Sequence, residues 1–248
     1  MIVLILLSAF LVSSGGVDLP PYIKKCSLSD PQFNECIMTK ANEVIPILTK
    51  GDILFGIPSL SPVSFTEAPL KVDNLFMILM DTYMDNFKDL RITKMVFDLS
   101  NRKVELSAVI DRIEVTAKNY TVISGEFVGV RAQGHGRFNA TLIKSTLDFK
   151  SDIQLYEKQG EVYMNLVNRV VNTNLERGYY YFENLKSATV VDMNAYIDEH
   201  WREFGAQVKP ATDVYIQELL YLPFSVIAAK RGELADKVPL HGHRDRQT

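Results

Sequence analysis

The strongest constraint on the fold is a long central region in which apolar residues recur at every second position. From about Val63 to Leu185 this alternation is typical of β-strands with one apolar and one polar face. The alternation changes phase near Asp111-Arg112 and again between Leu142 and Leu147, which predicts a bulge or a sharp bend at each place. Long, bent strands of this kind indicate a curved antiparallel sheet that closes around something apolar.

After Asp192 the spacing of apolar residues becomes helical. Steps of three and four residues predict one face of a helix of about 30 residues, roughly 45 Å long. That face consists of Ile197, Trp201, Phe204, Val208, Ala211, Tyr215, Leu219 and Leu222. Pro210 is expected to bend the helix, and Pro223 is expected to loosen its end. Because the apolar face of the sheet must be covered, we expect an α+β fold in which this helix fills the sheet.

A second helix is predicted near the N-terminus and is tied by a disulfide. Asp30-Pro31 has the form of a helix start, and Gly51 is expected to stop the helix after about Lys50. Cys26 and Cys36 are the only two cysteines, so they can pair with each other and leave no free thiol. Such a bond would hold the segment before Asp30 against the helix.

Composition excludes several classes of protein. The chain has 248 residues, of which 47% are hydrophobic, so it is long enough to bury a core and is neither disordered nor fibrous. Its 27 Lys and Arg residues are outnumbered by 30 Asp and Glu residues. Because nucleic-acid binding needs an excess of positive charge, we expect no nucleic-acid partner.

The first residues have the composition of a secretory signal peptide. Met1 to Val12 is an apolar run that ends in the small residues Ser13 to Gly16, which predicts cleavage near Gly16. The alternative is a buried N-terminal strand, because the run has no preceding Lys or Arg. It is shorter than the roughly 20 apolar residues of a transmembrane helix. We therefore expect a signal peptide at 1–16, one domain at 17–230, a polar tail at 231–248, and a secreted, extracellular protein.

Two sequons, at Asn119 and Asn139, agree with a secretory route. Asn139 falls on the polar phase of its predicted strand. Asn119 instead shares the phase of apolar Ile113 and Ala117, close to a strand end. We therefore expect Asn139 to carry a glycan more fully than Asn119.

The sequence contains no recognisable catalytic motif. It has no Gly-x-Ser-x-Gly elbow, no His-Glu-x-x-His motif and no phosphate-binding loop. His241 and His243 could share a metal, but their place on a charged tail favours simple solvation, and His200 is expected to be a partly exposed helical residue. The sequence therefore predicts a protein that is not an enzyme and that has no metal site and no cofactor.

Four blocks of sequence resemble the insect takeout and juvenile-hormone-binding protein family. Cys26 followed by Asp30 to Ile37 is similar to the N-terminal signature of the family, and Gly56-Ile57-Pro58-x-Leu60-x-Pro62 is similar to its next block. The mid-sheet and C-terminal blocks are Tyr120 to Gly125, Gly134-x-Gly136-x-Phe138, and Trp201 with Pro210. The blocks run in order from residue 20 to about residue 230, so the resemblance covers nearly all of the predicted mature chain.

The resemblance implies both a fold and a function. The fold is an elongated, highly curved antiparallel sheet wrapped around a long C-terminal helix, related to other tubular lipid-binding modules. The function is that of a carrier for terpenoids such as juvenile hormone, fatty acids or related lipids. Moth juvenile-hormone carriers typically have a second disulfide, which two cysteines cannot supply. The resemblance therefore favours the broader takeout-like group.

We interpret the apolar sheet face and helix face together as the wall of a ligand cavity. The candidate lining residues are Phe138, Leu142, Phe149, Ile153, Trp201, Phe204, Val208 and Tyr215. The alternative for each is that it packs a filled core. The rival functions are a membrane- or receptor-interacting secreted protein and, less favoured, a lipid hydrolase. A net charge of −3 and the lack of a cationic amphipathic segment argue against membrane binding. We expect a monomer that does not insert stably into membranes. The sequence does not identify a receptor, which is kept as a further partner.

Overall fold

The computed structural model describes residues 21–229, except for residues 25, 28, 29, 56, 58, 99, 159 and 160. The predicted signal peptide at 1–16, with its cleavage site near Gly16, lies outside the described residues. The predicted tail at 231–248, with His241 and His243, lies outside them as well, as do Gly56 and Pro58 of the second sequence block.

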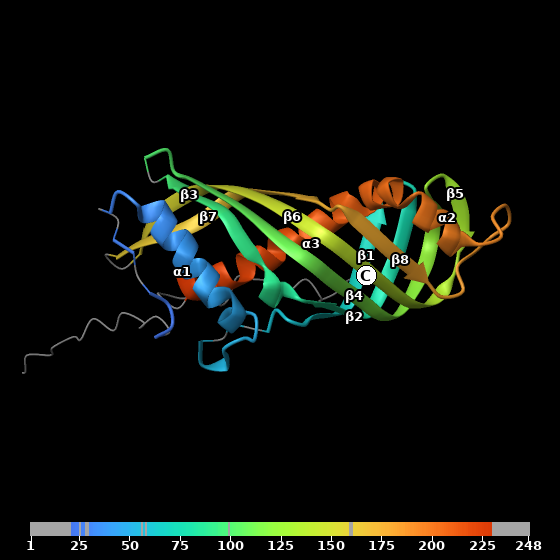
Figure 1. Ribbon diagram of the computed structural model, residues 1–248, viewed down its shortest axis with the longest axis horizontal. Helices are drawn as coiled ribbons and strands as arrows, with labels where there is room; N and C mark the ends of the chain where they lie inside the picture. Colours follow the sequence, from blue (N-terminus) through green and yellow to red (C-terminus); the bar gives the residue numbers. More distant parts are fainter. Residues whose placement is uncertain are drawn as a thin grey trace, which may run out of the picture.

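The described chain consists of a nine-stranded antiparallel sheet and three α-helices (Figure 1). The strands are β1 (Val63–Val72), β2 (Leu75–Asp85), β3 (Arg91–Asp98), β4 (Lys103–Phe127), β5 (Val130–Gln133), β6 (His135–Lys158), β7 (Glu161–Asn174), β8 (Arg177–Phe182) and β9 (Lys186–Ser187). The helices are α1 (Phe33–Leu48), α2 (Met193–Glu199) and α3 (Trp201–Ala229), with short 3₁₀ turns η1 (Ile53–Phe55) and η2 (Phe87–Asp89). This confirms the predicted fold class and the long C-terminal helix.

The elongated shape comes from two very long strands. β4 has 25 residues and β6 has 24, and they pair antiparallel from Lys103 opposite Asp152 to Thr121 opposite His135. On its other edge β4 pairs with β3 and then with β2, and β6 pairs with β7 and then with β8. Figure 1 shows α3 running along the length of this sheet, with α1 at one end and α2 and β5 at the other.

The two predicted changes of phase lie opposite each other in the sheet. Ile110 and Ile113 are both buried, and the two residues between them are exposed. In β6 the matching position is Lys144, whose φ of 46° places it in the left-handed region. Ile110 pairs with Ser145 and Arg112 with Ile143, so Lys144 stands opposite Asp111. Both strands therefore bend at one level, which confirms the predicted irregularity.

β6 and β7 form a β-hairpin. Their antiparallel ladder runs to Lys158, which pairs with Glu161. The intervening residues Gln159 and Gly160 lie outside the described part of the chain.

The helix boundaries differ from the predictions in two places. α1 begins at Phe33 and not at Pro31. The Asp30 carboxylate accepts a hydrogen bond from the backbone N–H of Gln32 (2.8 Å), which holds Gln32 in a turn before the helix. Its end agrees with the prediction, since Gly51 has a φ of 81°. The C-terminal helix is interrupted at His200, which separates α2 from α3. α3 then continues through Pro210 and past Pro223 to Ala229.

The predicted environment of Asn119 is wrong. Its side chain is exposed, because the β4–β6 register shifts between Ala117 and Tyr120 and turns Asn119 away from the apolar face. The Asn119 amide oxygen accepts a hydrogen bond from the backbone N–H of Gly136 (3.0 Å). Asn139 is exposed as predicted, and no hydrogen bond of its side chain is described.

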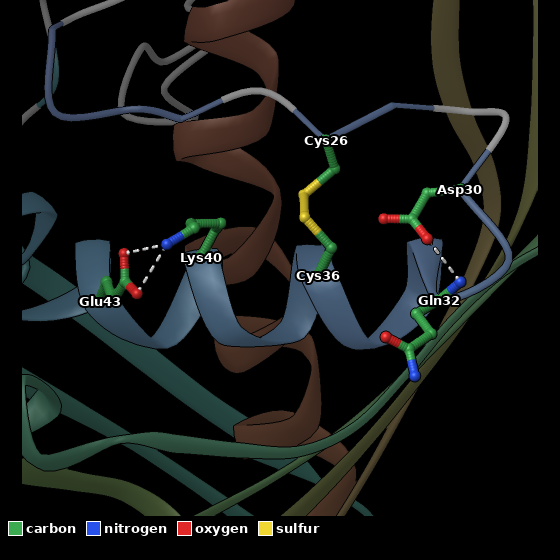
Figure 2. The surroundings of a disulfide bond; sticks show 6 residues. All are labelled: Cys26, Asp30, Gln32, Cys36, Lys40 and Glu43. Atoms are coloured by element: carbon green, nitrogen blue, oxygen red, sulfur yellow. Dashed lines mark hydrogen bonds and ion pairs between the residues drawn. A yellow bond between two sulfur atoms is a disulfide. The ribbon is translucent and has the colours of Figure 1, made fainter.

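The predicted disulfide is present. Cys26 is bonded to Cys36, and their Cα atoms are 6.1 Å apart. Figure 2 shows the segment before α1 reaching over the helix so that Cys26 meets Cys36 on its first turns. The bond therefore joins this segment to α1, and α1 packs in turn against β3, where the Asn42 side chain pairs with both backbone groups of Ile92.

We expect Cys36→Ala to lower the free energy of unfolding by roughly 2–5 kcal/mol, because the loop closed by the disulfide gains freedom in the unfolded chain. Denaturant titration measures the change, with the Cys26→Ala/Cys36→Ala variant as control. The double variant should lose the same amount as the single one. A single variant as stable as the native protein would contradict the structural role of the bond.

We expect Asn139 to be glycosylated more fully than Asn119 in insect-cell expression. Asn139 is exposed on the polar face of β6, whereas the Asn119 amide is engaged with Gly136. Site-resolved mass spectrometry of the secreted protein measures occupancy at each position. Higher occupancy at Asn119 would count against this assignment.

Candidate functional site

A cavity of about 370 Å³ lies between the inner face of the sheet and α3. Its wall is contributed by β1, β2, β4, β6, the end of β7, the segment between β7 and β8, β8 and α3. Apolar side chains dominate this wall, and a volume above about 300 Å³ is within the range of small-molecule sites.

Six of the eight predicted lining residues border this cavity. They are Phe138 and Leu142 from β6 and Trp201, Phe204, Val208 and Tyr215 from α3. The β6 residues face inward because of the strand alternation, and the α3 residues share one helical face. The alternation and the helical spacing thus bring together residues that are far apart in the chain.

Phe149 and Ile153 are not part of this cavity. They are 6% and 3% exposed and belong to a second buried cluster with Val104, Leu147 and Leu166. Side chains from both α1 and residues 216–221 of α3 pack against that cluster. At this end of the sheet two helices fill the space, so these two residues form part of the core.

The contribution of β1 and β2 to the cavity is not predicted by the sequence pattern. Phe65, Ala68 and Leu70 in β1 and Met77, Leu79 and Met84 in β2 all border the cavity. In β2 the signal was hidden, because Leu75 to Met80 is apolar at every position and shows no alternation. Only the pairing of β2 with β1 and β4 decides which of these side chains face inward.

Aromatic residues close one end of the cavity. Phe204 stacks on Phe127 with ring centroids 5.7 Å apart, and Phe182 contacts both rings edge-on. Tyr180 meets Phe204 at 4.8 Å, and burial raises the pKa of its phenol to about 12. This phenol therefore stays neutral at physiological pH.

Two other lining residues have polar partners in the protein itself. The Tyr215 hydroxyl donates to the carbonyl oxygen of Pro69 (2.9 Å). The Trp201 ring lies under the guanidinium groups of Arg177 and Arg202, at 5.1 Å and 4.5 Å from its centroid. The polar end of Tyr215 is thus satisfied, whereas the Trp201 ring lies against two cations.

A second cavity, of about 190 Å³, lies beside the first. It is bordered by the end of α1, by Phe87 and Leu90 near η2, and by Leu219 and Leu220 of α3. The two cavities share Ile113, Ser145, Thr173 and Ile216 in their walls. They are therefore neighbours along the length of the molecule.

A small polar network lies next to this shared wall. The Thr173 hydroxyl donates to the Asp213 carboxylate, and the Lys209 ammonium pairs with the same carboxylate. Because the two charges of this network cancel, it leaves no free charge to bind an ionic group.

The described part of the chain offers no metal-binding cluster. Among those residues no three His, Cys, Asp or Glu side chains lie close enough to hold an ion. None of the helices described combines the length and the apolar character that crossing a bilayer requires. The wall of the larger cavity is mainly apolar, with several hydroxyl groups and, among its charged residues, Glu176, Arg202 and Lys209.

Comparison with known families decides the relationship. The model of the haemolymph juvenile hormone binding protein family matches residues 2–230. The chain belongs to this family. The match confirms the family predicted from the ordered sequence blocks.

The family fold is also found among solved structures. The crystal structure of Takeout 1 from Epiphyas postvittana matches with a TM-score of 0.70 at 14% sequence identity, over 84% of this chain and 96% of that chain. The crystal structure of a lipopolysaccharide binding protein matches with a TM-score of 0.35 at 12% identity, over 76% of this chain and 39% of that chain. This score is too low to indicate a shared fold. No curated protein sequence matches the chain.

We expect Val208→Trp to obstruct the larger cavity. Val208 is 7% exposed and borders the cavity near the middle of the apolar helix face. The indole should weaken binding of a long-chain fatty acid methyl ester more than that of a short-chain one, because the long chain must pass Val208. Competition against a bound fluorescent probe measures both affinities.

Val214→Trp is the matched control, because Val214 lies on the same helix and is 59% exposed. This control should leave both affinities unchanged. Equal losses for the long and the short ester in Val208→Trp would argue that the occupied space does not extend past Val208. No loss for either would mean that Val208 is core at that level.

Proposed function

We propose that this protein is a secreted carrier that binds a hydrophobic small molecule in the larger cavity. The class of ligand is a terpenoid such as juvenile hormone, a fatty acid or a related lipid. The observation that carries the proposal is the apolar cavity itself, enclosed between the inner sheet face and α3.

Apolar burial is sufficient to drive binding. A ligand that buries about 15 carbons gains roughly 12 kcal/mol at about 0.8 kcal/mol for each CH₂ group. Association costs about 4–15 kcal/mol. At the low end of that cost the net gain corresponds to a dissociation constant near 1 μM, about −8 kcal/mol. A preformed cavity lowers the cost, so no charged anchor is required.

Membership of the family supports the same proposal. The family is described as haemolymph juvenile hormone binding protein, which names both an apolar ligand and an extracellular fluid. The Cys26–Cys36 disulfide supports an oxidising, extracellular environment. Secretion itself is tested by the mass of the mature protein in culture medium, which should correspond to cleavage near Gly16.

A second candidate is a secreted protein that docks on membranes. One observation favours it: Ile53 and Leu54 in η1 are 97% and 88% exposed, at the loop that follows α1. Large apolar side chains in this position could enter a lipid surface. Flotation with neutral and anionic liposomes separates the candidates, since a carrier alone stays with the soluble fraction.

The first test of the carrier function is direct identification of the ligand. Organic extraction of protein purified from insect-cell medium, followed by mass spectrometry, should recover an apolar molecule in a fixed ratio to protein. Extraction of the Val208→Trp variant serves as a comparison, because it should retain less of any long ligand. Delipidated protein that takes up none of the terpenoids, fatty acids or esters offered would refute the proposal.

We expect ligand binding to change the fluorescence of Trp201 in a saturable way. Trp201 is the only tryptophan and borders the larger cavity. An apolar ligand replaces the polar surroundings of part of the indole, so both intensity and emission wavelength should shift. Trp201→Phe keeps the apolar volume nearly unchanged and should bind the ligand in a competition assay without the signal. Saturable binding by competition with no Trp201 signal would place the ligand elsewhere.

A further inference from the structure

The described residues contain three buried side-chain oxygens that have no hydrogen-bond partner, and all three border a cavity. They are the hydroxyl oxygens of Thr49, Thr82 and Ser145. Thr82 borders the larger cavity, Thr49 the smaller one, and Ser145 both. Buried hydroxyl groups in folded proteins normally find a partner, because leaving one unpaired is costly. All three unpaired hydroxyl groups border a cavity, which suggests that their hydrogen-bond partner is an atom of a bound ligand.

The same backbone irregularity, a residue with positive φ, directly precedes both Thr82 and Ser145. Thr82 directly follows Asp81, and Ser145 directly follows Lys144; these two preceding residues have φ values of 47° and 46°. In β2 the buried residues are Leu79 and then Thr82, so the alternation skips one position at Asp81. Without that skip the strand would present Tyr83 inward. A left-handed conformation at a residue other than glycine is disfavoured and is often retained at functional sites.

The surroundings of Thr82 select an uncharged group. Thr82 is 3% exposed and pairs with Phe65 on one side and Ala117 on the other, both without charge. A carboxylate at this depth would be buried without a cation, at high cost. Ser145 borders the same cavity as Lys209, and the charge of Lys209 is balanced by Asp213.

We propose that Thr82 and Ser145 are specificity-determining residues that donate hydrogen bonds to uncharged oxygens of the ligand. This inference rests on the proposed carrier function and narrows it. The ligand class is an elongated apolar molecule that carries alcohol, ester, ketone or ether oxygens. Hydrocarbons are disfavoured because they leave the hydroxyls unpaired, and free carboxylates because the strand neighbours of Thr82, Phe65 and Ala117, carry no cation.

The test uses a matched series on one fourteen-carbon chain: the alkane, the primary alcohol, the methyl ester and the carboxylate. Competition against a naphthylamine fluorescent probe measures each dissociation constant. In the native protein the alcohol and the ester should bind about three- to tenfold more tightly than the alkane, the range expected of one neutral hydrogen bond. The carboxylate should bind no better than the alkane.

Thr82→Val and Ser145→Ala should each reduce this preference, and the double variant should bind alkane and ester equally. Thr82→Val should also raise the thermal midpoint of the ligand-free protein, because it removes an unpaired buried hydroxyl without changing the shape of the side chain. Thr82→Ser keeps a hydroxyl and should keep the preference. Thr212→Val is the control, because the Thr212 hydroxyl borders the same cavity but already donates to the carbonyl oxygen of Lys209 (3.0 Å).

Several results would overturn the inference. If the preference for the ester is unchanged in both variants, the hydroxyls do not contact the ligand. If only one variant loses the preference, the other residue has no such role. Tightest binding by the carboxylate would overturn the assignment to uncharged oxygens. Equal binding of all four compounds would leave the carrier function standing without this specificity, whereas failure of all four to bind would count against the carrier function itself.

Discussion

The pairing of β4 with β6 is the interaction on which the rest of the molecule depends. These strands carry one antiparallel ladder from Lys103 opposite Asp152 to Thr121 opposite His135. Each also pairs with two shorter strands on its outer edge, so the two ends of the sheet belong to one hydrogen-bonded surface. Because both strands bend at the same level, near Lys144, the surface curves without losing its register. α3 can then lie along the concave side and contact both ends.

A cavity persists between sheet and helix because small side chains face one another there. Ala68 and Ala140 on the sheet and Gly205 and Ala206 on α3 all border it. At the closed end, by contrast, Phe127, Phe182 and Phe204 are in ring contact and fill the space. Since close-packed protein interiors leave few voids, an apolar space of this size is a property of the fold that requires an occupant or a use.

Polar groups around the cavity fall into two sets. Tyr215, Thr173 and Thr212 donate to partners of the protein itself, so they contribute shape and rigidity. Thr82 and Ser145 have no such partner, although their hydroxyl oxygens are buried. In the first set, Tyr215 joins α3 to β1 and Thr173 joins β7 to α3. The second set is the one we propose to recognise a ligand, and only the three-dimensional structure separates the two sets.

The amino-acid sequence by itself determined the class of fold, the long C-terminal helix, the disulfide and the family, because these depend on local periodicity, on cysteine number and on ordered motifs. It also located six of the eight proposed cavity residues, since alternation and helical spacing define which face is apolar. It could not separate cavity from core at Phe149 and Ile153, because both environments require the same buried side chains. The tertiary structure decided that point through the packing of α1 and α3 at one end of the sheet. It also decided the outward turn of Asn119 and the inward turn of Thr82, because a single irregular residue reverses the face of every residue that follows it in a strand.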